Sequence, residues 1–167
     1  PEHMEQLAEK VLECHADLGI AFDGDGDRVG FVDNTGSPLV AEEATYILIQ
    51  SFGSSFSGSK FVYDLKFSDT IPAAARAAGA TPIAERSGHT FIRTRMIKED
   101  AQFGAEISGH YFYRELHYGD DGLFTACRLT TYLTQTEVPL SQLREKAPRP
   151  FITPDIRLAV QPSAPAF

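Results

Sequence analysis

Apolar residues recur at helical spacing near the start of the chain and then gather into short runs. Leu7, Val11 and Leu12 fall on one face of a helix. Two short apolar runs follow, and the first is apolar on both faces, as in a sheet that is covered on both sides. The pattern predicts a helix over residues 4–16 and strands over residues 18–22 and 29–33.

Beyond residue 41, helical and strand patterns alternate. Helical periodicity covers residues 42–52, 71–79, 90–100 and 122–135, and strand-like runs cover residues 60–65, 81–85 and 102–107. Such alternation is typical of parallel βαβ units, with helices on both faces of a sheet. The predicted fold class is α/β. It comprises a three-layered α/β/α domain with a mixed, mainly parallel sheet, preceded by an incomplete second α/β domain.

The chain divides into three parts on this pattern. Residues 1–40 hold one helix and two strands, as if the chain began partway through a domain, and residues 41–154 hold the alternating elements. Five prolines stand in the last twenty residues. That composition suits an exit strand and linker over residues 155–167 better than a domain core.

Composition excludes several functions. The 167 residues are 43% hydrophobic, which is enough for a core, and the formal net charge is −8. Without a run of lysines or arginines, we expect neither nucleic acid nor an anionic membrane as a partner. The longest apolar runs are too short to span a bilayer, and the two distant cysteines favour reduced thiols. We therefore expect a soluble, cytoplasmic protein.

Three aspartates alternate with glycines directly after the first predicted strand. Residues two apart in an extended loop point to the same side, so Asp23, Asp25 and Asp27 can converge. Crowded carboxylates repel one another unless a cation lies among them, and hard oxygen ligands suit Mg²⁺. Arg28, the next residue, can contact a phosphate or a carboxylate. The alternative is a solvated acidic turn, which the regular alternation with glycine disfavours.

Two other chemistries fit part of this loop. A calcium EF-hand counted from Asp23 needs glycine at its sixth position and glutamate at its twelfth, where this chain has Arg28 and Asn34. That alternative fails. A phosphatase with an aspartyl nucleophile also places Asp-x-Asp after an apolar strand, followed two residues later by Thr or Val. Here that position is Asp27, but the later "YGDDG" resembles its acidic metal motif, so this alternative stays open.

A second candidate site lies in "FGAEISGHYFYRE". Glu106 accepts hydrogen bonds from hydroxyl groups, Ser108 both donates and accepts, and His110 titrates near neutral pH. Such a set suits the paired hydroxyls of a sugar. Lys66 follows an apolar strand and His89 begins a helix, which are positions where sites in α/β proteins gather.

Together and in this order, the segments resemble the α-D-phosphohexomutases, most closely the bacterial phosphomannomutase/phosphoglucomutase group. "DGDGDR" is similar to the magnesium loop of that family and "AEISGH" to its sugar-binding loop. "YDLK", "SGHTFIR" and "YGDDGLFTACRL" are similar to its lysine, histidine and following loop-helix segments. The resemblance covers nearly the whole chain, from about residue 7 to residue 160.

The resemblance implies a reaction and a set of roles. The family is an isomerase group that interconverts hexose 1-phosphates and 6-phosphates, here of mannose or glucose, through a hexose 1,6-bisphosphate and a phosphoserine. Mg²⁺ is the implied cofactor. The implied metal ligands are Asp23, Asp25 and Asp27, the implied catalytic residues are Arg28, Lys66, His89 and His110, and the implied substrate-binding residues are Glu106, Ser108, Lys66, His89 and His110.

The family has four domains, and this chain resembles the latter part of the second and essentially all of the third. We find no loop to carry the phosphoserine and no late Arg- and Ser-rich loop for a second phosphate. The expectation is therefore a fragment without mutase activity of its own. A natural short protein that binds metal or sugar phosphate without catalysis is a further alternative, although an incomplete sheet would leave an open edge.

Overall fold

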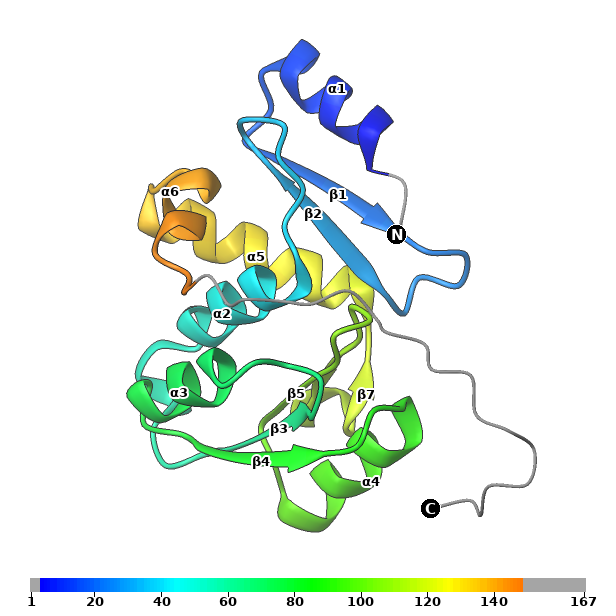
Figure 1. Cartoon of the computed structure of the whole chain (residues 1–167), viewed down its shortest axis with the longest axis vertical. Helices are drawn as coiled ribbons and strands as arrows, with labels where there is room; N and C mark the ends of the chain where they lie inside the picture. Colours follow the sequence, from blue (N-terminus) through cyan, green and yellow to red (C-terminus); the bar gives the residue numbers. More distant parts are fainter. Residues whose placement is uncertain (1–3, 149–167) are drawn as a thin grey trace, which may run out of the picture.

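The computed structural model describes residues 4–148 and divides them into a small hairpin unit and a larger sheet (Figure 1). Helix α1 (Glu5–Cys14) packs on the antiparallel strands β1 (Leu18–Phe22) and β2 (Val29–Asp33). The helix approaches closely because Gly19 has no side chain, and a Cβ there would lie 2.7 Å from Val11 Cγ2. The predicted elements of this region are confirmed.

The larger unit is built around a five-stranded sheet with the order β4-β3-β5-β6-β7. Its strands are β3 (Lys60–Asp64), β4 (Thr81–Glu85), β5 (Phe103–Ala105), β6 (Tyr111–Tyr113) and β7 (Gly119–Asp120). Strand β3 pairs in parallel with β4 and β5, whereas the β5–β6 and β6–β7 pairs are antiparallel. The sheet is mixed, as expected, and its parallel and antiparallel halves meet at β5.

Helices cover both faces of this sheet, which confirms the α/β/α layering (Figure 1). The helices are α2 (Ala41–Ser51), α3 (Thr70–Ala77), α4 (His89–Glu99), α5 (Gly122–Thr136) and α6 (Leu140–Glu145), with a 3₁₀ turn at Gly53–Phe56. Because successive strand residues face opposite sides, Phe61 packs toward α2 and α3 while Val62 packs toward α4. Among residues 4–148, no helix has the length and apolar character needed to cross a membrane.

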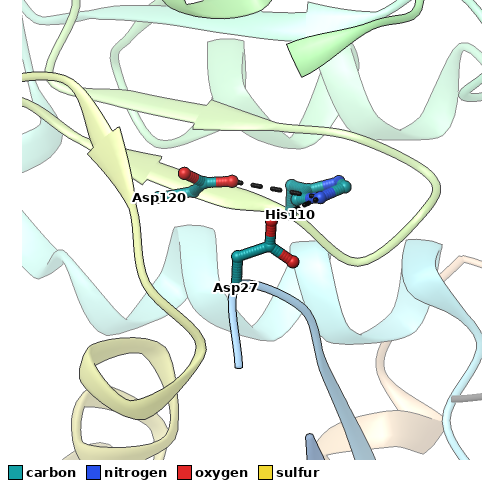
Figure 2. Close-up of side chains that lie close together, drawn as sticks. All are labelled: Asp27, His110 and Asp120. Carbon is teal, nitrogen blue, oxygen red and sulfur yellow. Dashed lines mark ion pairs between the residues drawn. The ribbon is translucent and has the colours of Figure 1, made fainter. Parts of the chain in front are cut away.

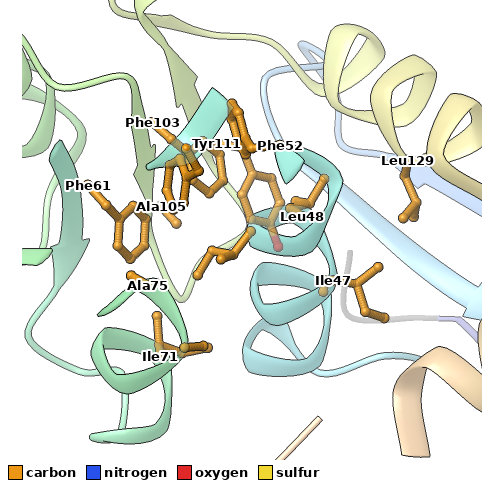
Figure 3. Close-up of a cluster of buried hydrophobic side chains, with 14 of the residues drawn as sticks. Ile47, Leu48, Phe52, Phe61, Ile71, Ala75, Phe103, Ala105, Tyr111 and Leu129 are labelled. Carbon is orange, nitrogen blue, oxygen red and sulfur yellow. The ribbon is translucent and has the colours of Figure 1, made fainter. Parts of the chain in front are cut away.

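The main core lies between the sheet and helices α2, α3 and α5 (Figure 3). Its centre is a group of aromatic rings in which Phe52 stacks on Phe56 at 4.8 Å between centroids and Phe61 stacks on Phe103 at 5.4 Å. Fully buried rings of this size contribute about 1.5–3 kcal/mol each through burial. This rigid layer supports the loops at the ends of β3, β5 and β6.

Three elements were not predicted: strands β6 and β7 and helix α6, because each is too short to show a period. Strand β1 is covered on both faces, as predicted, because Ala21 packs toward α1 whereas Leu18 and Ile20 pack toward the core that includes α5. Only its last residue, Phe22, is 42% exposed. The predicted exit strand and linker at 155–167 lie outside the described residues.

Candidate metal and sugar-phosphate site

The three alternating aspartates lie in the loop that joins β1 to β2. Oxygen atoms of Asp23, Asp25 and Asp27 come within 4.8 Å of one another. Gly26 makes the turn between them with φ +79°, a left-handed conformation that favours glycine. The predicted convergence of the three carboxylates is thus a property of the fold.

Asp23 is the fixed member of this loop. Its Oδ1 accepts hydrogen bonds from the backbone N–H groups of Gly26 (3.1 Å) and Arg28 (3.2 Å), and its Oδ2 accepts one from Arg28 Nε (2.6 Å). Burial acts to raise the pKa of Asp23, but these bonds and the guanidinium charge outweigh it and lower the pKa to about 2. The carboxylate is therefore ionised at neutral pH.

Glu106 and His110 lie in the turn between β5 and β6. Glu106 is buried, and its Oε1 accepts a 2.6 Å hydrogen bond from the Gly88 backbone N–H, while its Oε2 lies 3.1 Å from His110 Nδ1. Ser108 Oγ lies 2.8 Å from the same ring nitrogen. The turn closes at Gly109, whose φ of +96° again requires glycine. Two of the predicted sugar-binding residues, Glu106 and Ser108, therefore contact a third, His110.

Backbone bonds join the aspartate loop to this turn. Arg28 and His110 form an antiparallel bridge, and the Val29 N–H donates to the Gly109 carbonyl at 3.3 Å. Helix α5 begins against the same loop, because the Gly122 N–H donates to the Gly26 carbonyl at 3.1 Å. A Cβ at Gly122 would lie 2.6 Å from that carbonyl oxygen, so the close approach depends on glycine.

His110 sits among carboxylates (Figure 2). Its Nε2 lies 3.4 Å from Asp27 Oδ2 and 4.0 Å from Asp120 Oδ2, and its Nδ1 faces Glu106. Burial acts to lower the pKa of His110, but the hydrogen bond with Glu106 and the charges of Asp27, Glu106 and Asp120 outweigh it and raise the pKa. The surroundings favour a protonated, positively charged ring.

The two remaining predicted site residues, His89 and Lys66, differ in how closely they are connected to this site. His89 begins α4, as predicted, and its ring lies 5.9 Å from that of His110. Lys66 is exposed, and its ammonium makes no ion pair with any residue in the described range 4–148. Its loop is nevertheless tied to the segment before His89, because Asp64 Oδ1 accepts from both Lys66 N (3.0 Å) and Ser87 Oγ (2.5 Å).

Asp120 is a member of this site that the sequence prediction did not include. Its Oδ1 lies 2.9 Å from His89 Nε2. The sequence assigns the "YGDDG" segment only a place in the motif order and a resemblance to a phosphatase metal motif. The sequence feature that could have identified Asp120 is the pair of adjacent aspartates before a helix. Asp121 caps α5, because its side chain accepts from the Phe124 N–H at 2.7 Å, whereas Asp120 faces the histidines.

The aspartate loop has the chemistry to hold Mg²⁺. It offers three carboxylates, and Asp27 Oδ1 is buried without a hydrogen-bond partner among residues 4–148, as expected of an atom that a cation would satisfy. Both oxygens of Asp23 already accept hydrogen bonds, so Asp23 would help to hold a dication while it remains paired with Arg28. The residues fit the ion.

Comparison with known proteins places the chain in a class. The family model described as "Phosphoglucomutase/phosphomannomutase, alpha/beta/alpha domain III" matches residues 39–151, and the model for alpha/beta/alpha domain II matches residues 1–36. The chain belongs to the phosphoglucomutase/phosphomannomutase family.

Individual relatives agree with this assignment. A phosphomannomutase/phosphoglucomutase of Pseudomonas putida is 36% identical over 161 residues, which are 96% of this chain and 35% of that protein. A phosphoglucomutase of Neisseria gonorrhoeae is 30% identical over 96% of this chain and 35% of its own length. A solved phosphoglucomutase/phosphomannomutase family protein from Burkholderia thailandensis superposes with a TM-score of 0.84 and 30% identity, over 92% of this chain and 34% of that one. The chain thus spans about a third of the length of these relatives.

Proposed function

We propose that this chain is the metal- and sugar-binding core of an enzyme that interconverts hexose 1-phosphates and hexose 6-phosphates. The observation that carries the proposal is the backbone junction between the aspartate loop and the turn at residues 106–110, made by the Arg28–His110 bridge. It sets a cation-binding group of carboxylates against side chains suited to sugar hydroxyls. The named relatives act as phosphomannomutase or phosphoglucomutase, which supports mannose and glucose phosphates as the substrates.

Asp23, Asp25 and Asp27 are the proposed ligands of Mg²⁺. When bound, the dication would supply positive charge to neutralise a transferring phosphoryl group. Arg28, held beside Asp23, adds a second positive charge in the same place. Phosphoryl transfer depends mainly on such positioning and charge stabilisation.

The turn at residues 106–110 would bind the sugar. Burial acts to raise the pKa of Glu106, but the bonds from His110 and the Gly88 N–H outweigh it, so the pKa is lowered and the acceptor stays ionised. Ser108 is exposed and can donate to or accept from a sugar hydroxyl. His110 is proposed to hold a proton beside the reacting group, with His89 next to it. Lys66 would contact the phosphate end from its exposed position.

The complete reaction needs groups outside this chain. We propose that the phosphoserine and a second phosphate-binding loop belong to other domains of a longer enzyme, and that hexose 1,6-bisphosphate forms between them and this core. On this proposal residues 1–40 belong to domain 2, residues 41–154 form domain 3, and residues 155–167 lead toward domain 4. The chain alone would bind ligands without turnover.

The phosphatase alternative needs a free aspartyl oxygen as nucleophile. Both oxygens of Asp23 accept hydrogen bonds from Arg28 and from backbone N–H groups, which argues against Asp23 as a nucleophile. Asp120 of "YGDDG" does lie near His110, which also faces Asp27, so the acidic motif by itself does not separate the two chemistries. A non-catalytic metal or sugar-phosphate binding module is the remaining alternative, and it shares the binding half of the proposal.

Amide NMR of the isotope-labelled chain tests the binding half. Titration with Mg²⁺ is expected to shift resonances of residues 23–28, and glucose 1,6-bisphosphate is expected to shift those of residues 88–89 and 106–110. In Asp25→Asn the Mg²⁺ shifts should be lost while the bisphosphate still binds in the turn. If neither ligand shifts these residues, the proposal is wrong. Turnover of glucose 1-phosphate by the chain alone, with bisphosphate and Mg²⁺, would overturn the expected inactivity.

A further inference from the structure

The position of Asp120 in the site is explained by the short strand in which it lies. Strand β7 consists of Gly119–Asp120 alone, and its pairing with β6 sets Asp120 opposite Phe112. The side chain then lies next to His89 and is only 9% exposed. It also faces His110 (Figure 2). The strand is too short to add much to the sheet, so its clearest effect is the placement of this carboxylate.

The two oxygens of Asp120 differ in their surroundings. Oδ1 lies 2.9 Å from His89 Nε2, whereas Oδ2 is buried, lies 4.0 Å from His110 Nε2 and has no hydrogen-bond partner among residues 4–148. A buried polar atom without a partner destabilises the folded state by about 1–3 kcal/mol. Folding stability alone therefore does not account for an aspartate at this position.

The neighbouring residue excludes the commonest structural explanation. An aspartate just before a helix usually caps its N-terminus, but in α5 that role belongs to Asp121, whose Oδ1 accepts from the Phe124 N–H. Asp120 is thus available to act on the histidines.

We propose that Asp120 is a positioning residue that fixes the tautomer and the orientation of His89. A carboxylate only accepts hydrogen bonds, so the 2.9 Å contact requires the proton of His89 on Nε2. In the neutral ring, Nδ1 is then left as the acceptor for a donor group on a ligand. The same bond keeps the ring edge-to-face with His110, at 5.9 Å and 77°.

This inference rests on the proposed function only in its choice of ligand, a hexose phosphate. With Asp120 in place, His89 presents one defined nitrogen beside His110. Without it, the exposed ring samples other rotamers and both tautomers, and ordering it again opposes binding. We therefore expect Asp120→Ala to weaken glucose 1,6-bisphosphate binding by about two- to tenfold, the loss expected when one side chain has to be ordered on binding.

Imidazole nitrogen NMR of the chain tests the tautomer directly and without any ligand. At about pH 8.5, where an ordinary imidazole is neutral, wild-type His89 should show a protonated Nε2 and a bare Nδ1. Asp120→Ala should give a mixture of both tautomers. Asp120→Asn keeps an oxygen acceptor and should retain most of the wild-type pattern. Asp121→Asn makes the same charge change at the next residue and should leave His89 unchanged.

The possible results separate this inference from the proposed function. If His89 keeps its tautomer in Asp120→Ala, or loses it equally in Asp121→Asn, the positioning role is wrong. If the tautomer depends on Asp120 but glucose 1,6-bisphosphate binds no variant and not the wild type, the positioning role stands and the proposed ligand is wrong. If bisphosphate binds wild type and Asp120→Ala equally, the tautomer does not contribute to binding and the inference fails in its functional part.

Discussion

Arg144 joins the hairpin unit to the larger sheet, and its replacement is expected to weaken the whole described fold. Its Nη1 donates to Asp33 Oδ2 at the end of β2 (3.2 Å), and its Nε donates to Glu43 Oε1 in α2 (2.9 Å). The side chains of Asp33 and Glu43 are 2% and 9% exposed, so Arg144→Met leaves two buried carboxylate oxygens without their charged donor.

The size of the effect follows from burial. Breaking a buried ion pair by removing one partner costs about 3–5 kcal/mol. Arg144 is a quarter exposed, and Asp33 Oδ1 keeps three donors from Thr35 and Ser37, so water and these donors recover part of the loss. We expect Arg144→Met to lower the free energy of unfolding by about 2–3 kcal/mol, a large share of the total of about 5–15 kcal/mol.

Urea unfolding followed by circular dichroism at pH 7 measures this change. Arg114→Met is the matched control, because Arg114 pairs with Asp100 at 3.4 Å where both side chains are about half exposed or more. Such a surface pair contributes less than about 1 kcal/mol. A loss in Arg144→Met no larger than in Arg114→Met would refute the view that this arginine joins the two units.

The pKa of Asp33 determines how this difference in stability changes with pH. Burial acts to raise the pKa of Asp33, but the bonds from Thr35, Ser37 and Arg144 outweigh it and lower the pKa. A lowered folded-state pKa means that Asp33 stabilises the fold above the ordinary aspartate value of about 3.9 and that this contribution is lost as the pH falls through the folded-state value. The stability difference between wild type and Arg144→Met should therefore shrink below about pH 4.

Three further substitutions probe the site. Asp25→Asn should weaken Mg²⁺ binding at least about tenfold in calorimetry, since hard cations need the carboxylate charge, while exposed Asp69→Asn should change it little; equal effects would argue against the aspartate loop. Gly122→Ala should destabilise the chain by about 1–3 kcal/mol in urea, because its Cβ meets the Gly26 carbonyl, and unchanged stability would contradict that packing. Glu106→Gln should weaken bisphosphate binding in NMR titrations without abolishing folding; unchanged affinity would remove Glu106 from the site.

Much of the fold could be predicted because its longer elements follow their periods closely. The helices over α2, α4 and α5 and the strands β3 and β4 carry enough apolar residues to show a pattern. Strand β6 has only three residues and β7 only two, so neither shows alternation. Strand β6 depends on pairing with β5, and β7 depends on pairing with β6, and such pairing is a tertiary effect.

In the candidate site, too, some residues could be predicted from the sequence and others could not. Asp23, Asp25 and Asp27 could be placed together from local spacing alone, because their convergence is set within one loop. Asp120 could not, because its approach to His89 depends on the register of a two-residue strand. Lys66 is the opposite case. The motif "YDLK" predicts it as a site residue, but its ammonium forms no ion pair with any of the described residues.

The junction at Arg28 and His110 constrains how a ligand can enter. Backbone hydrogen bonds from Val29 to Gly109 and from Gly122 to Gly26 hold the aspartate loop, the 106–110 turn and the start of α5 together. Moving these segments apart to widen the space between them would break those hydrogen bonds. On the proposed function, we therefore expect a phosphorylated sugar to enter through movement at another boundary, while these two loops keep their relative positions.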